Sequence, residues 1–160
     1  MIINDLININ FGFDRERLLE EANQLAGYET FIDPKYNTQI SGWQIKKINS
    51  SYGLEISNFL KDYFQLKDSS PRFFIQPPGV SIMFHRDRGT KCSFNFVLSD
   101  DPDPISFRHR QVVYKTALLN TSIEHAVLNP KNRRILFKVS VFDKTFEEIK
   151  NSLPSKFQFE

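Results

Sequence analysis

The sequence is poor in the features that mark secreted and membrane proteins. It contains one cysteine, Cys92, so no internal disulfide can form. This favours a reducing compartment, because small secreted domains usually depend on several disulfides. No apolar run approaches the roughly 20 residues of a membrane span, and the first residues lack the basic and apolar regions of a secretory signal. We therefore expect a cytoplasmic protein without a membrane partner.

A surplus of one charge is also missing. The 21 Lys and Arg residues nearly balance the 19 Asp and Glu residues, for a formal net charge of +2. Domains that bind nucleic acid usually carry a strong basic surplus, so we expect no nucleic-acid partner. Phenylalanine, in contrast, is abundant with 16 residues, which suits two large packed faces such as paired sheets. With 160 residues and no visible repeat or linker, the chain is expected to form one domain over residues 1–160.

Apolar residues at helical spacing predict three helices, over 13–27, about 54–66 and about 144–151. In the first, Asp14 is suited to the N-cap and Gly27 to the C-terminal stop. Leu18, Leu19, Ala22 and Leu25 are expected to form its apolar face.

From Pro71 onward, short β-branched and aromatic runs alternate with turns. The predicted strands cover 72–76, 80–85, 91–98, 111–119 and 134–142. Close spacing without intervening helices predicts antiparallel pairing. We expect an α+β chain with a helical part at about 1–70, a jelly-roll-like β core at about 71–143, and a C-terminal helix and tail at 144–160.

His85 and Asp87 stand at the end of a predicted strand, where residues two apart point to the same face. With His125 they can form a triad of two imidazoles and one carboxylate, which suits non-haem Fe(II) and leaves coordination positions open. An H-x-D tripeptide alone is a weak signal, and a later lone histidine is more often a satisfied surface or core residue. The chain has only three histidines, however, and two of them end strands.

Nine positions after His125, Arg134 opens the most regular alternating strand of the sequence. Arg134 and Lys138 share one face with Leu136 and Ser140, while the other face is wholly apolar. An arginine looking into a cavity can bind a carboxylate in two-pronged geometry. The alternative is that Arg133 and Arg134 are only surface charges at the rim of a hairpin.

Three stretches, 75–87, 118–125 and 134–143, resemble the 2-oxoglutarate- and iron(II)-dependent oxygenase superfamily. The likeness is strongest to its aspartyl/asparaginyl β-hydroxylase-like and proline hydroxylase branch, and it covers roughly the C-terminal 75 residues. The resemblance implies a double-stranded β-helix core, cupin-like, with the N-terminal helices packed on one sheet.

The resemblance also implies roles for individual residues. His85, Asp87 and His125 match the iron ligands and catalytic centre, and Arg134 matches the residue that binds the distal carboxylate of 2-oxoglutarate. Asn95, Ser93 and Lys138 are expected to contribute to the cofactor site. The implied activity is a dioxygenase that uses 2-oxoglutarate and O₂ to hydroxylate an unactivated C–H bond, releasing succinate and CO₂. Asp87 argues against a halogenase, because halide would need its coordination position.

Other interpretations stay open. The chain can be a cupin-like metal- or carboxylate-binding protein without turnover, or a β-sandwich adaptor in which the triad never converges. Ser93 stands where some relatives have arginine, which leaves the closer subfamily open. The substrate is either a free amino acid or a residue in a peptide or protein. Arg86 and Arg88 beside the triad either meet an acidic substrate or are plain surface charges. Trp43 is expected to be a packing anchor or to line the substrate pocket. The segment Arg108–Arg110 is expected to be a solvated loop.

Overall fold

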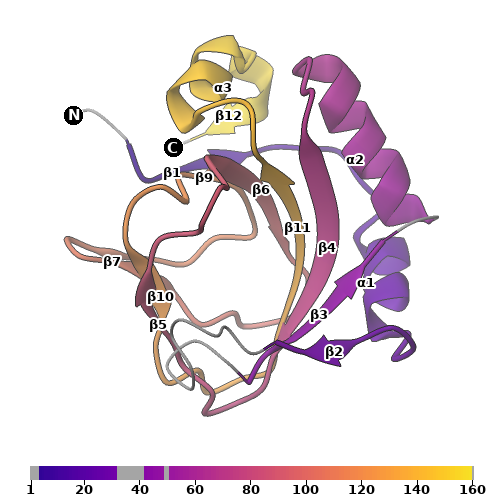
Figure 1. Ribbon diagram of the computed structural model, residues 1–160, viewed down its shortest axis with the longest axis vertical. Coiled ribbons are helices and arrows are strands. Elements are labelled where there is room, and N and C mark those ends of the chain that lie inside the picture. Colours follow the sequence, from indigo (N-terminus) through magenta and orange to yellow (C-terminus); the bar gives the residue numbers. More distant parts are fainter. Residues whose placement is uncertain (1–3, 32–41, 49–50, 160) are drawn as a thin grey trace.

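Two antiparallel sheets face each other in the computed structural model, and the helices lie outside the larger sheet (Figure 1). The structure describes residues 4–31, 42–48 and 51–159. Its helical elements are α1 (Arg15–Asn23), α2 (Tyr52–Tyr63), α3 (Phe146–Ser152) and the short 3₁₀ helix η1 (Ser155–Phe157).

The larger sheet has eight strands in the order β12-β1-β9-β6-β11-β4-β3-β2. Their bounds are β12 (Gln158–Phe159), β1 (Leu6–Ile9), β9 (Thr116–Leu119), β6 (Cys92–Val97), β11 (Arg134–Val141), β4 (Ser69–Gln76), β3 (Gln44–Lys47) and β2 (Glu29–Thr30). The smaller sheet has the order β5-β10-β7-β8. Its strands are β5 (Ile82–His85), β10 (His125–Val127), β7 (Ile105–Phe107) and β8 (Gln111–Val112).

Alternation along the central strands of the larger sheet produces two separate cores, because successive side chains point to opposite faces. The core between this sheet and the helices includes Phe73, Phe94, Phe96, Phe137, Leu18, Leu60 and Ile149. The core between the two sheets includes Leu6, Phe74, Val97, Ile105, Phe107, Leu119 and Leu136. The predicted α+β class is confirmed, with a double-stranded β-helix and helices on one sheet.

The N-terminal part of the chain, predicted to be helical, also supplies strands. β1 pairs with β9, and β3 pairs with β4, so both extend the larger sheet. These strands have four residues each and pair with partners remote in sequence, so local alternation alone does not reveal them.

The first helix ends earlier than Gly27, the predicted stop. α1 closes at Asn23, and the Lys46 ammonium binds the carbonyl oxygens of Glu21 and Gln24 at 2.9 and 2.7 Å. The last carbonyl oxygens of a helix lack the regular partner four residues on, although that of Glu21 also accepts the N–H of Gln24 at 3.2 Å, so a lysine from β3 is well suited to end the helix there. As a result Leu25, predicted to lie on the buried face, is 71% exposed.

The other two helices are shifted from their predicted bounds. α2 begins at Tyr52 rather than Leu54, because Ser51 caps it and the Glu21 carboxylate accepts the N–H groups of Tyr52 and Gly53. α3 begins at Phe146, where Thr145 and Glu148 form a capping box.

The predicted strand 111–119 is two strands in different sheets. β8 ends at Val112, β9 begins at Thr116, and the three residues between them carry the chain from the smaller sheet to the larger one. Within this link, Val113 is exposed whereas Tyr114 is buried between the sheets. The turn therefore directs the Tyr114 side chain into the interior.

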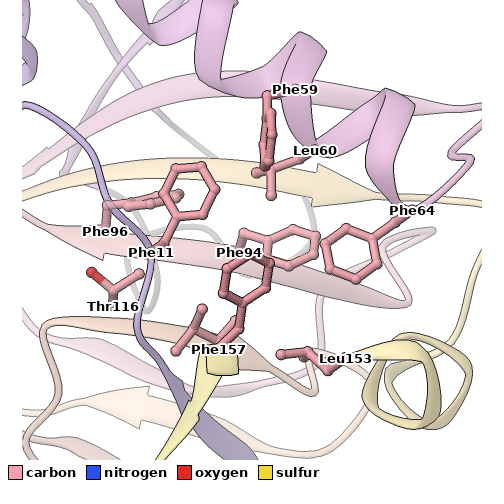
Figure 2. A pocket seen from close by; sticks show the side chains of 10 residues that line it. Phe11, Phe59, Leu60, Phe64, Phe94, Phe96, Thr116, Leu153 and Phe157 are labelled. Carbon is pink, nitrogen blue, oxygen red and sulfur yellow. The ribbon is translucent and has the colours of Figure 1, made fainter. Parts of the chain in front are cut away.

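Aromatic residues converge where α2 meets the C-terminal tail (Figure 2). Phe11, Phe64, Phe94 and Phe157 surround a space of only about 10 Å³. That volume is about the size needed for one water molecule, so this apolar seam is packing rather than a ligand site. None of the helices within the described residues has the length and apolar character needed to cross a bilayer.

The segment Arg108–Arg110, predicted to be solvated, is exposed but also anchors the N-terminus. Asp5 is buried, and its carboxylate accepts hydrogen bonds from Arg110 Nε and Nη2 at 2.8 and 2.5 Å. His109 Nε2 lies 2.8 Å from the same carboxylate. Burial opposes the ionisation of Asp5, but Arg110, the N–H of Leu6 and His109 together hold its pKa below the usual range.

Replacing Asp5 with asparagine is expected to lower the free energy of unfolding by about 1–2 kcal/mol at neutral pH, because the charged hydrogen bonds to Arg110 are lost. The loss is no larger because the Arg110 guanidinium is partly exposed and water screens its charge. The wild-type contribution is complete above the unfolded pKa of about 3.9 and disappears as the pH falls below it. Urea titrations at neutral and acidic pH measure both effects. Asp100→Asn, at a side chain 96% exposed, is the control. Equal stability of Asp5→Asn and wild type at neutral pH would contradict the anchoring role.

Candidate metal centre

Two histidines that lie 40 positions apart in sequence meet across neighbouring strands of the smaller sheet. β10 pairs with β5, and His125 is directly opposite His85. Side chains directly opposite in an antiparallel pair lie on the same face, so the two rings come together. Their centroids are 4.5 Å apart, and both side chains are largely buried.

The same local hydrogen bond orients both rings. His85 Nδ1 lies 2.6 Å from the carbonyl oxygen of Met83, and His125 Nδ1 lies 2.8 Å from that of Ile123. A carbonyl oxygen only accepts, so Nδ1 carries the proton in each ring and Nε2 is left with a free lone pair. This is the tautomer that a metal-binding histidine needs.

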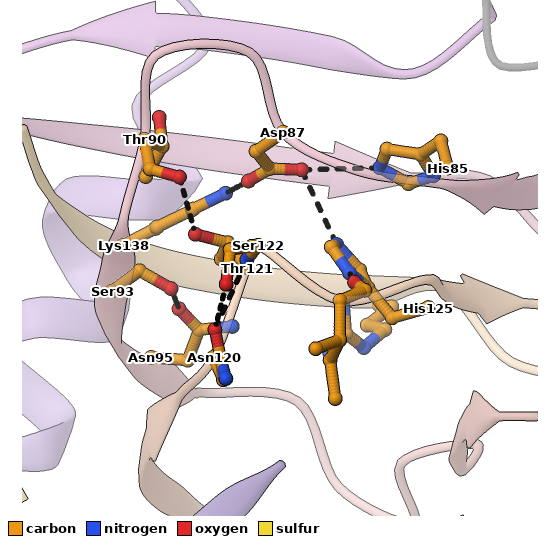
Figure 3. A network of polar contacts seen from close by, with 12 residues as sticks. His85, Asp87, Thr90, Ser93, Asn95, Asn120, Thr121, Ser122, His125 and Lys138 are labelled. Atoms are coloured by element: carbon orange, nitrogen blue, oxygen red, sulfur yellow. Dashed lines mark hydrogen bonds and ion pairs between the residues drawn. The ribbon is translucent and has the colours of Figure 1, made fainter. Parts of the chain in front are cut away.

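Asp87 completes the group from the loop that follows β5 (Figure 3). Its Oδ1 lies 3.2 Å from Nε2 of both His85 and His125. Its backbone N–H donates to the carbonyl oxygen of Thr121 at 3.1 Å, and the Thr121 hydroxyl donates to that of Thr90 at 3.0 Å. These bonds tie the loop carrying Asp87 to the loop that precedes His125.

The other oxygen of Asp87 is already engaged. Lys138, from β11, donates to Oδ2 at 2.6 Å. Burial opposes the ionisation of Asp87, but the Lys138 ammonium beside it favours the charged form, and the pKa of this carboxyl lies well below its usual range. The carboxylate therefore stays ionised, which leaves Oδ1 available as a single ligand atom.

The three groups suit a metal ion chemically. The two Nε2 atoms and a carboxylate oxygen lie within 4.8 Å of one another, and with neutral imidazoles all three present lone pairs. Lone pairs aimed at one point repel each other unless a cation lies between them. Two histidines and one carboxylate form the facial triad typical of non-haem Fe(II).

A second polar group lies farther along β11, around Arg134. This side chain is 6% exposed, and its Nη2 donates to the Tyr114 hydroxyl at 2.8 Å. Asn95 Nδ2 donates to the same hydroxyl at 3.0 Å, and Ser93 donates to Asn95 Oδ1 at 2.7 Å. We call this group, Ser93, Asn95, Tyr114 and Arg134, the Arg134 recess.

The Arg134 recess has more donors than acceptors. Tyr114 oxygen accepts twice, which leaves its own O–H to donate, and Arg134 Nε is buried without any partner among the described residues. A buried donor without an acceptor is costly, so such a group indicates a missing partner that accepts. A carboxylate fits, because it accepts at two oxygens and offsets the guanidinium charge.

A cavity of about 190 Å³ lies beside the triad. Its lining consists of Phe31, Trp43, Ile45, Arg72, Phe74, His85, Arg86, Asp87, Arg88, Thr90, Lys138 and Ser140. The Trp43 ring lies 5.3 Å from Phe31 and 5.1 Å from Phe74, which places it both in packing and on the cavity wall. Arg134 is not among the residues that line this cavity.

The structure thus brings His85, Asp87, His125 and Lys138 into contact, and it groups Arg134 with Asn95 and Ser93. Their roles toward a metal or a co-substrate stay predictions. Two residues were missed or undervalued in the sequence. Tyr114 lies in the link between β8 and β9, where the sequence pattern predicts one continuous strand, and Arg72 faces the cavity because β4 pairs with β11, which no local pattern reveals.

No family model and no curated protein matches the chain. Solved structures do match. A prolyl hydroxylase from Trichoplax adhaerens, in complex with a peptide fragment of the hypoxia inducible factor oxygen degradation domain, has a TM-score of 0.69 at 14% identity, covering 93% of this chain and 86% of that one. A Pseudomonas putida prolyl-4-hydroxylase has a TM-score of 0.61 at 15% identity over 81% of this chain and 86% of its own.

An oxidoreductase of the 2OG-Fe(II) oxygenase family from Burkholderia pseudomallei has a TM-score of 0.54 at 12% identity. It is matched over 78% of its length by 80% of this chain. At such identities the likeness shows a shared fold, and this chain has the fold of these oxygenases.

Proposed function

We propose that the chain is an Fe(II)- and 2-oxoglutarate-dependent dioxygenase that hydroxylates an unactivated C–H bond of an amino acid or of a residue in a peptide or protein, releasing succinate and CO₂. The observation that carries the proposal is the convergence of His85 Nε2, His125 Nε2 and Asp87 Oδ1 within 4.8 Å of one another. The shared fold with two prolyl hydroxylases supports it.

His85, Asp87 and His125 would hold the iron, and each has a feature suited to that task. The Nδ1 hydrogen bonds to Met83 and Ile123 prevent ring rotation. The Lys138 ammonium occupies Asp87 Oδ2, so Asp87 would bind through one oxygen and leave other coordination positions open. When bound, iron and 2-oxoglutarate would supply the oxidising chemistry for C–H hydroxylation with O₂.

Arg134 would bind the distal carboxylate of 2-oxoglutarate. Its unpartnered Nε and the free O–H of Tyr114 offer two donors to a carboxylate. Asn95 holds Tyr114 in place, and Ser93 holds Asn95. Ser93 and Asn95 would therefore support the co-substrate indirectly, while Lys138 would act through Asp87.

A second candidate is a cupin-like metal- or carboxylate-binding protein without turnover. The Lys138–Asp87 contact at 2.6 Å favours it, because an ammonium already lies beside the triad. A charged neighbour of this kind can stabilise the carboxylate even without a metal.

An assay for succinate separates the two candidates. The protein is incubated with Fe(II), 2-oxoglutarate and O₂ across a panel of amino acids and short peptides, and succinate is quantified. We expect succinate that depends on all three reagents and rises with at least one panel member, together with a gain of one oxygen atom in that member by mass spectrometry. Tight binding of Fe(II) and 2-oxoglutarate without succinate from any mixture would support the cupin-like alternative.

A further inference from the structure

Positive charge gathers in the cavity beside the triad. Among the described residues, four cationic side chains line it, Arg72, Arg86, Arg88 and Lys138, against a single carboxylate, that of Asp87. The whole chain has a formal net charge of only +2, so this cavity is far more basic than the protein as a whole. A bound divalent metal would add two positive charges and 2-oxoglutarate two negative ones, so the basic surplus would persist after both had bound.

Two of these cations have no acidic partner. Lys138 pairs with Asp87, and Arg86 lies 3.6 Å from Glu124. Arg72 and Arg88, in contrast, have no carboxylate within ion-pair distance in the part of the chain that the structure describes. A concave site with unpaired cations and apolar walls raises the local concentration of anions.

Arg72 also has an unmet hydrogen bond. Its Nε is buried and has no acceptor among the residues that the structure describes, and the same holds for Nε1 of Trp43, which lines the same cavity. Both atoms only donate. Buried donors of this kind are normally satisfied, so two in one cavity indicate an acceptor that arrives with a ligand.

Arg72 is correctly placed for a substrate group. It is the direct register partner of Lys138, whose ammonium contacts Asp87. Side chains directly opposite in an antiparallel pair share a face, so an anion bound by Arg72 would lie in the same cavity that His85 and Asp87 line. Trp43 and Phe74 supply an apolar wall for the carbon atoms of such a ligand.

We propose that the primary substrate is acidic, with a carboxylate held by Arg72 and with the carbon atoms next to that carboxylate facing the triad. This inference rests on the proposed function for the identity of the site as an oxygenase centre. It concerns an anion other than 2-oxoglutarate, because Arg134, the residue suited to that co-substrate, lies outside this cavity. A free acidic amino acid and an acidic residue within a peptide present the same carboxylate.

The tryptophan on the cavity wall provides a binding signal that does not depend on turnover, because Trp43 is the only tryptophan of the chain. Anaerobic protein with Fe(II) and 2-oxoglutarate is titrated with matched acid and amide probes, glutamate against glutamine and aspartate against asparagine. Each probe is used both as the free amino acid and between glycines in an acetylated, amidated tripeptide. Comparing the two formats identifies the source of the carboxylate.

We expect saturable changes in Trp43 fluorescence with an acidic probe and at least tenfold weaker binding of its amide. Arg72→Gln should weaken binding of the acid by about tenfold to a hundredfold, the range for charged hydrogen bonds. Arg72→Lys should restore part of it, since charge returns without the two-pronged geometry. Arg17→Gln, on α1, is the control and should bind as wild type does.

Equal binding of acid and amide would overturn the inference, and so would the absence of a response to every acidic probe. An acid preference that survives Arg72→Gln in folded protein would overturn it as well. Thermal melting of each variant verifies folding. Arg72-dependent binding of an acid without succinate formation would leave this inference intact and contradict the proposed oxygenase activity. The two proposals can therefore fail separately.

Discussion

Replacing His125 with alanine is expected to reduce succinate production to background and to weaken Fe(II) binding by more than about a hundredfold. Loss of an outer partner of a metal ligand already costs about 10–100-fold in affinity, and His125 is proposed as a direct ligand. Only His85 and Asp87 would remain, and two ligands do not define a facial triad. Anaerobic Fe(II) titration measures the affinity, and the succinate assay measures turnover.

The structure gives a reason why no other residue would replace His125. The chain has three histidines, and the third, His109, is bound to Asp5 in the anchor of the N-terminus. Among the described residues, the triad is the only group of His, Cys, Asp and Glu side chains close enough to hold a metal. The loss of succinate production in His125→Ala should therefore be complete rather than partial.

His109→Ala is the matched control. It removes an imidazole whose side chain is 59% exposed, outside the triad. We expect unchanged Fe(II) affinity and succinate production, with at most a small loss of stability through Asp5. If His125→Ala bound iron as tightly as His109→Ala while both stayed folded, the metal site would have to lie elsewhere.

Local pattern in the sequence was enough to place two of the three triad residues together. His85 and Asp87 are two positions apart at a strand end, and such residues share a face whatever the register. His125 depends on the pairing of β10 with β5, and β10 has only three residues. A strand that short shows no alternation of its own, so His125 was linked to the other two by the small number of histidines, the spacing to Arg134 and the resemblance to a known family.

The contrast between local pattern and strand pairing also applies to the other polar residues of the site. Eight residues of regular alternation on β11 predicted that Arg134 and Lys138 face away from the helix-side core, as observed. Local pattern did not predict that Lys138 would contact Asp87, because that contact joins β11 to the loop after β5. Arg72 lies beside Lys138 because the two residues are register partners on β4 and β11. Tertiary pairing, rather than periodicity, decides which polar side chains meet.

Replacing Arg134 with methionine is expected to raise the KM for 2-oxoglutarate by about a hundredfold to a thousandfold. Removing one partner of a buried ion pair typically costs about 3–5 kcal/mol, and partial rescue by the Tyr114 hydroxyl would place the effect at the lower end. Methionine keeps much of the unbranched side-chain volume of arginine, so packing around this 6% exposed position is largely preserved. Initial rates over a range of 2-oxoglutarate concentrations give the KM.

The effect should be confined to the co-substrate. Arg134 is absent from the triad and from the lining of the neighbouring cavity, so Fe(II) affinity and binding of an acidic probe should change little. Arg133→Met is the matched control, because Arg133 is the adjacent arginine in sequence and is exposed. We expect it to show the wild-type KM for 2-oxoglutarate.

A comparison with Arg72→Gln determines which arginine binds which anion. If Arg134 binds 2-oxoglutarate and Arg72 binds the substrate, each variant raises one Michaelis constant and leaves the other nearly unchanged. If Arg72→Gln instead raised the KM for 2-oxoglutarate while Arg134→Met did not, the co-substrate would occupy the basic cavity. Arg134, Tyr114 and Asn95 would then form a buried structural network, and neither assignment would stand.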